Sequence, residues 1–188
     1  HKLVADKPLV STEDKCPQLF FLMSGTLRVV SHADNYRYRI EEEMSAPAVI
    51  QPEHLFGLMQ RYTKDFIAQT DCSLLSLDKS EVLRLLDYYL IFRLNLLNSI
   101  SMQAQRMSHI PWRQQPSDIR QQFINFLRLR CLTQAGHKVL KIRMEDLAQE
   151  LHQSRLNVSR MLNALQRDGL LTMSRGVITV PQLEALRG

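Results

Sequence analysis

Short apolar runs separated by turn residues fill the first 78 positions of the chain. One run, residues 18–23, is apolar and aromatic and stops at Ser24 and Gly25; another, residues 36–40, alternates strictly, as one face of a strand does. Many short strands with turns between them are typical of a small β-roll or barrel. The runs of this kind cover residues 18–23, 26–30, 36–40, 66–70 and 73–77. The three glutamates at 41–43 are expected to form a solvated turn.

The period of the pattern then changes from strand to helix. Residues 78–87 predict a short helix, and residues 90–109 predict a longer one that contains no Gly or Pro. Apolar residues recur in it at spacings of three or four, which places them on one stripe. Its early part is apolar nearly all round, so one face can cover the roll and the other a second copy of the chain. The alternative is a helix buried only in its own monomer. The residues expected in a dimer interface are Leu94, Leu97, Ile100, Ala104 and Met107.

Two prolines, Pro111 and Pro116, predict a hinge after this helix. Ser117 is expected to cap the next helix and Gly136 to stop it. A short strand at 139–143 follows. The pattern then predicts a helix at 144–151, a tight turn and a second helix at 154–168, with Ser154 as N-cap and Gly169 as stop. Small Ala148 allows the two helices to cross closely.

The second helix of this pair carries the residues that indicate a function. Its apolar face leaves Arg155, Asn157, Ser159 and Arg160 exposed, and such side chains can reach phosphates and base edges. A helix-turn-helix places this part of its second helix in the major groove of DNA. Residues 170–174 and 177–180 predict a hairpin that forms a wing, with Arg175 at its tip near a phosphate. A helical hairpin that only fills space is the alternative.

Charge and composition narrow the class of protein. Residues 1–110 carry 12 basic and 13 acidic side chains, and residues 111–188 carry 12 and 6, so the excess positive charge lies in the C-terminal part. This asymmetry favours an anionic partner for that part, with nucleic acid first. Three scattered cysteines predict reduced, mostly buried thiols rather than disulfides or a metal site. No apolar run approaches the ~18 residues of a membrane span. The chain begins at His1, so we expect its natural start to be missing, and no signal peptide is visible.

Residues 147–180 resemble the DNA-binding domain of the Crp–Fnr regulators, the cyclic-AMP receptor protein family. The motif runs from Ser154-Arg155 through Val158-Ser159-Arg160 to Gly169-Leu170-Leu171, and residues 19–25 resemble the family's β-roll signature. The resemblance implies a homodimer held by the central helix. It implies that Arg155 and Arg160 read bases, that Ser154 and Asn157 contact phosphates, and that Ser159 lies beside the bases.

Departures from the family pattern change some expectations. Leu156 stands where members often carry Glu, and a leucine cannot accept a hydrogen bond from cytosine N4, so the preferred half-site should differ. His152 replaces the usual Gly of the tight turn, and histidine tolerates the left-handed backbone better than most residues.

The expected sensor region departs further from the family pattern. Pro52 and Tyr62 fall where cyclic-AMP binders have a ribose-binding Glu and a phosphate-binding Arg, so we expect no cyclic-AMP site unless Arg61 restores it. The alternatives left open are a haem sensor using His32, His54 or His109, and a redox sensor using Cys16 or Cys72.

The expected architecture is α+β. It comprises an N-terminal cupin-like β-roll sensor (1–87), a long central dimerisation helix (88–110), a hinge (111–116) and a C-terminal winged helix-turn-helix (117–188). We expect a cytoplasmic, dimeric, sequence-specific transcription regulator, without enzyme activity or a metal and with an unidentified effector or none. Its partners would be a palindromic operator in double-stranded DNA and RNA polymerase, with no membrane. The alternative is a ligand- or cyclic-nucleotide-binding module whose winged helix docks a protein.

Overall fold

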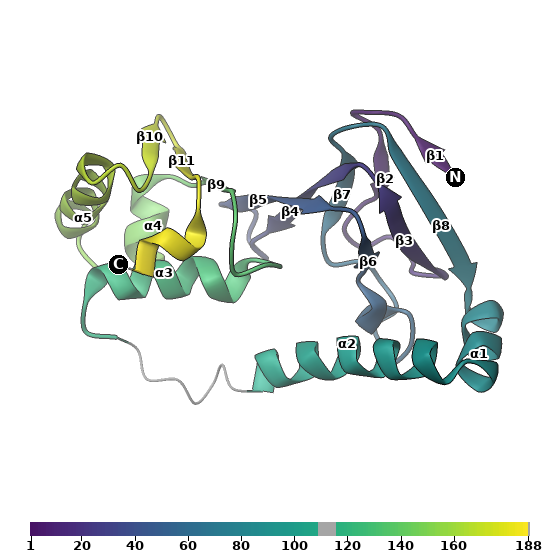
Figure 1. The fold of residues 1–188 in the computed structure, drawn as a ribbon. Helices are drawn as coiled ribbons and strands as arrows, with labels where there is room; N and C mark the ends of the chain where they lie inside the picture. Colours follow the sequence, from purple (N-terminus) through teal and green to yellow (C-terminus); the bar gives the residue numbers. More distant parts are fainter. Residues whose placement is uncertain (109–115, 188) are drawn as a thin grey trace. The chain divides into compact units, whose positions relative to one another are not determined.

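The computed structural model describes residues 1–108 and 116–187, in two compact units that do not follow the order of the chain. Unit 1 comprises His1–Arg28 and Met44–Arg113, and unit 2 comprises Val29–Glu43 and Gln114–Gly188. The chain therefore passes from one unit to the other three times (Figure 1). Of the predicted hinge, residues 111–115 lie outside the described part, as does His109.

Unit 1 is a roll of short strands, but residues 29–43, which the sequence analysis assigned to the roll, belong to unit 2. A four-stranded sheet has the order β1-β8-β3-β6, and β2, β7 and the first residues of β4 form a second sheet. Leu19, Leu22 and Leu27 have no exposed surface, and Ile50 and Phe66 are as deeply buried, so the apolar runs point into one core. The bounds are β1 (Lys2–Leu3), β2 (Pro8–Val10), β3 (Gln18–Ser24), β4 (Thr26–His32), β6 (Ala48–Ile50), β7 (Asp65–Ala68), β8 (Cys72–Asp78) and the 3₁₀ turn η1 (Pro52–His54).

The turn between β3 and β4 requires glycine. Gly25 has a φ of 92°, and a Cβ added there would lie 2.5 Å from the backbone oxygen of Asp71. Any side chain would therefore meet both an unfavourable backbone conformation and the neighbouring strand. This explains the Ser-Gly stop noted in the sequence.

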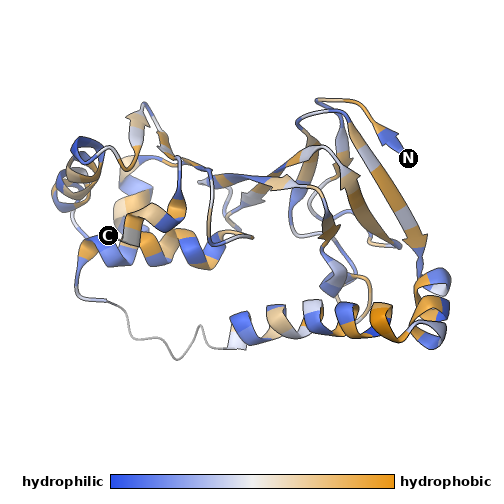
Figure 2. Ribbon diagram, viewed as in Figure 1, coloured by the Kyte–Doolittle hydropathy of each residue, from blue (hydrophilic) through white to orange (hydrophobic). Residues whose placement is uncertain are grey.

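Two helices complete unit 1. Asp78 caps α1 (Lys79–Tyr88) by accepting a hydrogen bond from the backbone N–H of Glu81, and the Glu81 carboxylate accepts one from the backbone N–H of Asp78. This reciprocal capping box satisfies two of the free donors at the helix start. The following helix, α2 (Leu90–Ser108), is most hydrophobic near α1 and more polar toward its end (Figure 2).

Unit 2 is built on three helices and a sheet with the order β10-β11-β9-β5. Its core joins α3, α4 and α5 through buried residues such as Phe123, Leu127, Leu147, Val158 and Leu162. The bounds are β5 (Arg39–Ser45), α3 (Ile119–Arg130), β9 (Lys138–Lys141), α4 (Met144–Glu150), α5 (Arg155–Arg167), β10 (Thr172–Ser174), β11 (Val177–Val180) and the 3₁₀ helix η3 (Leu183–Arg187). The winged helix-turn-helix architecture that the pattern predicts is confirmed.

The hairpin Val29–Glu43 belongs to unit 2, because β5 pairs antiparallel with β9 over four residues, Arg39 to Glu42. Ile40 is 1% exposed and joins the core of this unit. Tyr38 accepts a 2.8 Å hydrogen bond from Arg130, whose guanidinium also lies 2.8 Å from Glu150. The β-pattern of residues 36–40 begins too early, since Tyr36 has a φ of 55° and β5 starts at Arg39.

The prediction of a solvated turn at residues 41–43 is wrong. Glu42 lies in β5 and forms an ion pair of 2.8 Å with Lys138, and both side chains are only 1% exposed. Its carboxylate also accepts hydrogen bonds from the backbone N–H groups of Leu132 (2.5 Å) and Thr133 (3.1 Å). The Glu42 carboxylate can be buried because the ammonium group of Lys138 and the two backbone N–H groups pair with it.

Two boundary predictions also need correction. Asp118, not Ser117, caps α3 by accepting a hydrogen bond from the N–H of Gln121. The helix ends at Arg130, six residues before Gly136, because Cys131 already has an extended backbone.

Candidate nucleic-acid interface

The α4–turn–α5 segment has the geometry that the sequence predicts. Its turn passes through His152 with a φ of 51°, and Gln153 donates a backbone hydrogen bond of 2.9 Å to the carbonyl of Ala148. The Ser154 hydroxyl accepts a 3.2 Å bond from the N–H of Asn157, which confirms it as the N-cap of α5. The helix ends beside Gly169, whose φ is 71°. The turn and cap together fix the direction in which α5 leaves α4.

The two faces of α5 differ sharply. Val158, Met161, Leu162 and Leu165 are all at most 7% exposed and pack into the core of unit 2. Opposite them, the solvent-facing surface begins with Arg155, Leu156, Asn157 and Arg160, which are all exposed. Ser159 departs from the prediction, because it is half-buried and its hydroxyl lies 3.4 Å from the amide nitrogen of Asn163.

Arg155 has a partner that the sequence analysis missed. Its guanidinium lies 3.0 Å from a carboxylate oxygen of Glu145 in the first turn of α4, and both side chains are more than half exposed. An exposed pair of this kind adds at most about 1 kcal/mol to stability, so it orients Arg155 rather than holding the fold together. No spacing rule predicts the pair, because it depends on how α4 crosses α5.

Arg160 borders two open hollows on the surface of unit 2. It lines one, of about 510 Å³, with Asn157 and the start of α3, and another, of about 820 Å³, with Asn163, Gln166 and Arg167. Arg167 lies seven residues after Arg160, two helical turns on, and this periodicity was the signal by which it could have been found. Among the residues that the structure describes, no carboxylate forms an ion pair with Arg160.

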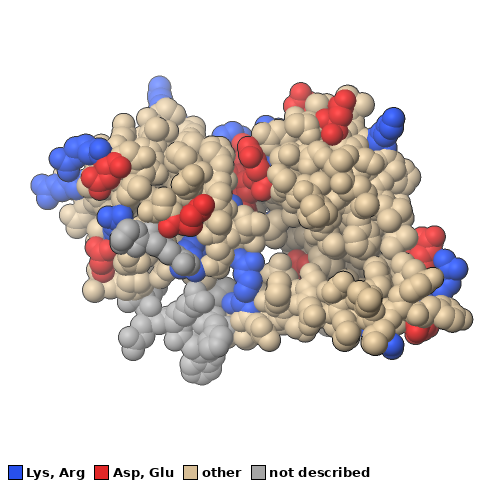
Figure 3. All heavy atoms as spheres, in the orientation of Figure 1, with Lys and Arg blue, Asp and Glu red and all other residues tan. Residues whose placement is uncertain are grey.

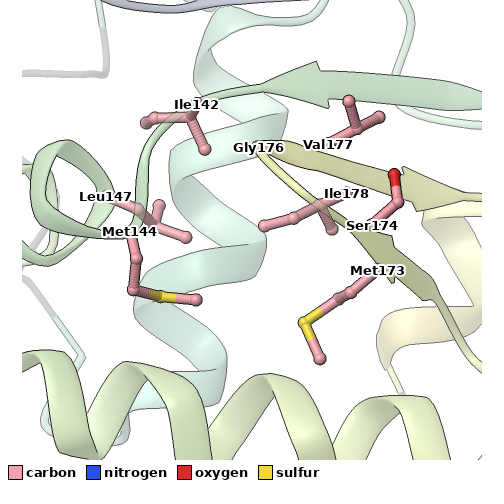
Figure 4. Close-up of a pocket in the computed structure, with 8 residues that line it drawn as sticks. All are labelled: Ile142, Met144, Leu147, Met173, Ser174, Gly176, Val177 and Ile178. Carbon is pink, nitrogen blue, oxygen red and sulfur yellow. The ribbon is translucent and has the colours of Figure 1, made fainter.

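The wing is a tight hairpin. Residues of β10 and β11 pair from Thr172–Thr179 to Ser174–Val177, which leaves Arg175 and Gly176 as a two-residue turn with Arg175 exposed. Below the wing, Met144 and Met173 point toward each other across an apolar pocket of about 80 Å³ that Leu147, Ile178 and Ile142 also line (Figure 4). This pocket is smaller than the ~150 Å³ apolar cavity that accommodates a benzene ring, so we take it as loose packing under the wing.

Basic side chains gather at the α5 edge of unit 2 in the space-filling view (Figure 3). The acidic Asp146 of α4 contributes little negative charge to this surface, because its side chain is only 6% exposed. A hydrogen bond of 2.7 Å from Arg143 lowers the pKa of its carboxyl. Within α5 itself every charged side chain is an arginine, which favours a polyanion as partner.

Three residues of the sensor region, Gln51, Arg61 and Tyr62, are each engaged by hydrogen bonds within unit 1. Gln51, with a left-handed φ of 39°, is 4% exposed, and its side chain bonds the backbone N–H and hydroxyl of Thr63. Burial raises the pKa of Tyr62, whose hydroxyl donates to the carbonyl of Gln18. Arg61 is exposed and donates to the carbonyl of Glu13.

Metal-ligand clusters and disulfides are both absent from the described residues. No group of three or more His, Cys, Asp or Glu side chains there could hold a metal ion. Cys16, Cys72 and Cys131 are buried, as predicted, and form no disulfide within the described residues; burial raises the pKa of the Cys16 thiol. In the described part, no helix is long and apolar enough to cross a membrane.

The predicted dimer residues lie along α2 with one face uncovered. Leu94 and Leu97 are 49% and 53% exposed, Ala104 and Met107 are exposed, and Ile100 is half-buried. Leu96 is buried, so a different face of the helix packs within unit 1.

A roll of antiparallel strands, a long helix and a winged helix-turn-helix define a class of DNA-binding transcription regulators with a sensor domain. Two family models match the chain in this order: a cyclic nucleotide-binding domain over residues 1–89 and a Crp-like helix-turn-helix domain over residues 121–188. The chain belongs to the Crp–Fnr family of transcription regulators, which are not enzymes.

Solved structures show a similar fold at low identity. A transcriptional regulator of Thermotoga maritima is 20% identical, covers 58% of this chain and 84% of its own length, and has a TM-score of 0.53. The c-di-GMP-responsive global regulator CLP of Xanthomonas campestris is 16% identical, with 96% of this chain and 92% of its own covered and a TM-score of 0.51. A CooA mutant from Carboxydothermus hydrogenoformans is 16% identical over 100% of this chain and 85% of its own, with a TM-score of 0.50. No curated protein matches the sequence.

Proposed function

We propose that the protein is a homodimeric, sequence-specific regulator that inserts the N-terminal half of α5 into the major groove of DNA. In this proposal Arg155 and Arg160 read base edges, and Ser154 and Asn157 contact phosphates. Ser159 lies beside the bases, and Arg175 at the wing tip reaches a phosphate of the flanking backbone.

The observation that carries the proposal is the environment of Arg160. Its guanidinium is exposed on the outward face of α5, beside Asn157, and it has no ion-pair partner in the described chain. A planar guanidinium group that is not paired with a carboxylate can donate hydrogen bonds to O6 and N7 of one guanine. These two hydrogen bonds discriminate between bases by about 1–3 kcal/mol. Arg155, held by Glu145, is available at the same end of the helix.

The test is selection of bound sequences from random DNA, followed by titration of the best site and of a scrambled site at several salt concentrations. We expect steep salt dependence and a strong preference for the selected site. Arg160→Ala should remove most of the preference at one symmetric base pair, whereas Arg84→Ala, an equal change of charge on α1, should preserve it. Equal losses on both sites would make Arg160 a phosphate contact. Binding that neither depends on salt nor selects a sequence would favour a winged helix that docks protein.

A dimer formed along α2 would pair the two reading helices. The support is the row of Leu94, Leu97 and Met107, which are all exposed while Leu96 faces the interior. Apolar side chains at this spacing match the seam of a two-helix coiled coil. Two copies of α5 related by a two-fold axis would bind a palindromic operator with half-site centres about 34 Å apart.

The sensor unit resembles a cyclic nucleotide-binding domain, but we propose that cyclic AMP is not its effector. A buried cyclic phosphate needs a charged donor such as arginine. At the corresponding positions this chain has Pro52 and Tyr62, both buried, and Arg61 is turned to the Glu13 carbonyl. The effector, if one is used, has different chemistry.

The remaining partners follow from the proposed role. A regulator bound at a promoter lies beside RNA polymerase, which we propose as its protein partner. We place the protein in the cytoplasm, with the chromosomal DNA that it would bind.

A further inference from the structure

Leu156 is an apolar residue with an exposed side chain, so it contributes little to the core that stabilises unit 2. Its side chain is 58% exposed, on the outward face of α5, and it is the most exposed large aliphatic residue of unit 2 in the described part of the chain. Single exposed leucines are common on protein surfaces. This one stands between Arg155 and Asn157 and one helical turn before Arg160, at the centre of the proposed reading surface.

The chemistry of the major groove limits what a leucine can contact there. Base-pair edges present hydrogen-bond donors and acceptors, and one apolar group, the C5-methyl of thymine. A leucine against a polar edge would leave the edge without water or a partner, which is unfavourable. Against the methyl group it removes apolar surface from water instead.

Leu156 and Arg160 lie one helical turn apart on the exposed face of α5. Arg155, at the start of the same helix, is oriented by its 3.0 Å ion pair with Glu145. The Cα atoms of Leu156 and Arg160 are separated by four residues, or about 6 Å along the helix axis. Since base pairs are stacked about 3.4 Å apart, the two side chains should meet bases one or two steps apart.

We propose that Leu156 is a specificity-determining residue that contacts the C5-methyl group of a thymine in each half-site. This thymine lies one or two base pairs from the guanine that Arg160 contacts. The proposal rests on the function proposed above, in which α5 enters the major groove. Members of the family often carry Glu at this position, and a carboxylate can accept a hydrogen bond from cytosine. In this chain Leu156 would instead recognise thymine through its methyl group.

The test removes only the methyl group. In the selected operator, each thymine of one half-site is replaced in turn by uracil, and affinity is measured by fluorescence anisotropy with the full chain. We expect one position at which wild-type affinity falls about fourfold, the effect of withdrawing one methyl group from apolar contact. At that position, 5-methylcytosine should bind better than cytosine by a similar factor.

Leu156→Ala should bind the thymine and uracil operators equally, while still discriminating against replacement of the guanine that Arg160 contacts. Leu129→Ala, a matched truncation of a 37%-exposed leucine on α3, should keep the full uracil effect. Alanine favours helix, so equal melting temperatures of both variants and the wild type would show that folding is intact.

The outcomes separate this inference from the proposed function. Sequence-specific binding in which no uracil substitution matters, or in which Leu156→Ala keeps the uracil effect, overturns the role of Leu156 and leaves the regulator intact. Absence of any sequence-specific binding overturns the proposed function and with it this inference.

Discussion

Replacing Glu42 by alanine removes the carboxylate that joins the hairpin Val29–Glu43 to the rest of unit 2. The carboxylate pairs with Lys138 at 2.8 Å and accepts backbone hydrogen bonds from Leu132 and Thr133. Both charged side chains are 1% exposed, so the ammonium of Lys138 would be left without a counter-charge in a site that water does not reach. Breaking a buried pair in this way costs about 3–5 kcal/mol.

Matched variants separate the charge from the hydrogen bonds. Glu42→Gln combined with Lys138→Met removes both charges and keeps an acceptor oxygen for one of the two backbone N–H groups, so it should recover part of the loss, because replacing a whole buried pair is nearly neutral. Glu41→Gln breaks the neighbouring pair with Lys141, where the side chains are 13% and 36% exposed, and should cost no more than about 1 kcal/mol.

Hydrogen exchange is the suitable assay, because two units need not unfold together and a global transition would average them. In Glu42→Ala the protection of the β9 amides should fall by a factor of about 10² to 10⁴, the equivalent of 3–5 kcal/mol at 1.36 kcal/mol per tenfold. The amides of β3 and β8 in unit 1 serve as internal controls. A loss no larger than that of Glu41→Gln would refute the argument that the pair stabilises unit 2.

The other predictions concern assembly, the sensor and acid stability. Leu97→Glu places an unpaired carboxylate in the proposed α2 seam, so sedimentation should show dissociation to monomers at concentrations where Asn95→Glu, half a turn away on the helix, remains dimeric. Calorimetry should detect no binding of cyclic AMP at micromolar concentration; a clear isotherm that Arg61→Ala abolishes would show that this arginine holds the phosphate. Arg143 lowers the pKa of Asp146, so the charge of Asp146 stabilises the fold above its unfolded pKa of about 3.9 and ceases to do so as the pH falls through the lower folded value. Asp146→Asn should therefore lower the melting temperature at pH 7, and the difference should vanish near pH 2; a difference that does not depend on pH would exclude the ion pair as its source.

Local signals in the sequence predicted much of the fold and the position of the proposed reading helix. The apolar period of α5, the hydroxyl of Ser154 and the flexible backbone at Gly169 act within a few residues, so the helix and its ends could be inferred before any tertiary contact was known. The same holds for the Ser24-Gly25 turn. Arg160 could be placed on the outward face because the buried apolar stripe of α5 leaves only the opposite face for it.

Contacts between distant parts of the chain were decided only by the tertiary structure. Strand alternation tells which face of β5 is apolar, but not that its partner is β9, and so the sequence could not show that Glu42 meets Lys138, 96 residues away. Without knowledge of that partner, the three glutamates at 41–43 are expected to face solvent. The pairing of Arg155 with Glu145 has the same origin: each side chain lies on a predictable helix, but the distance between them depends on how the two helices pack against each other.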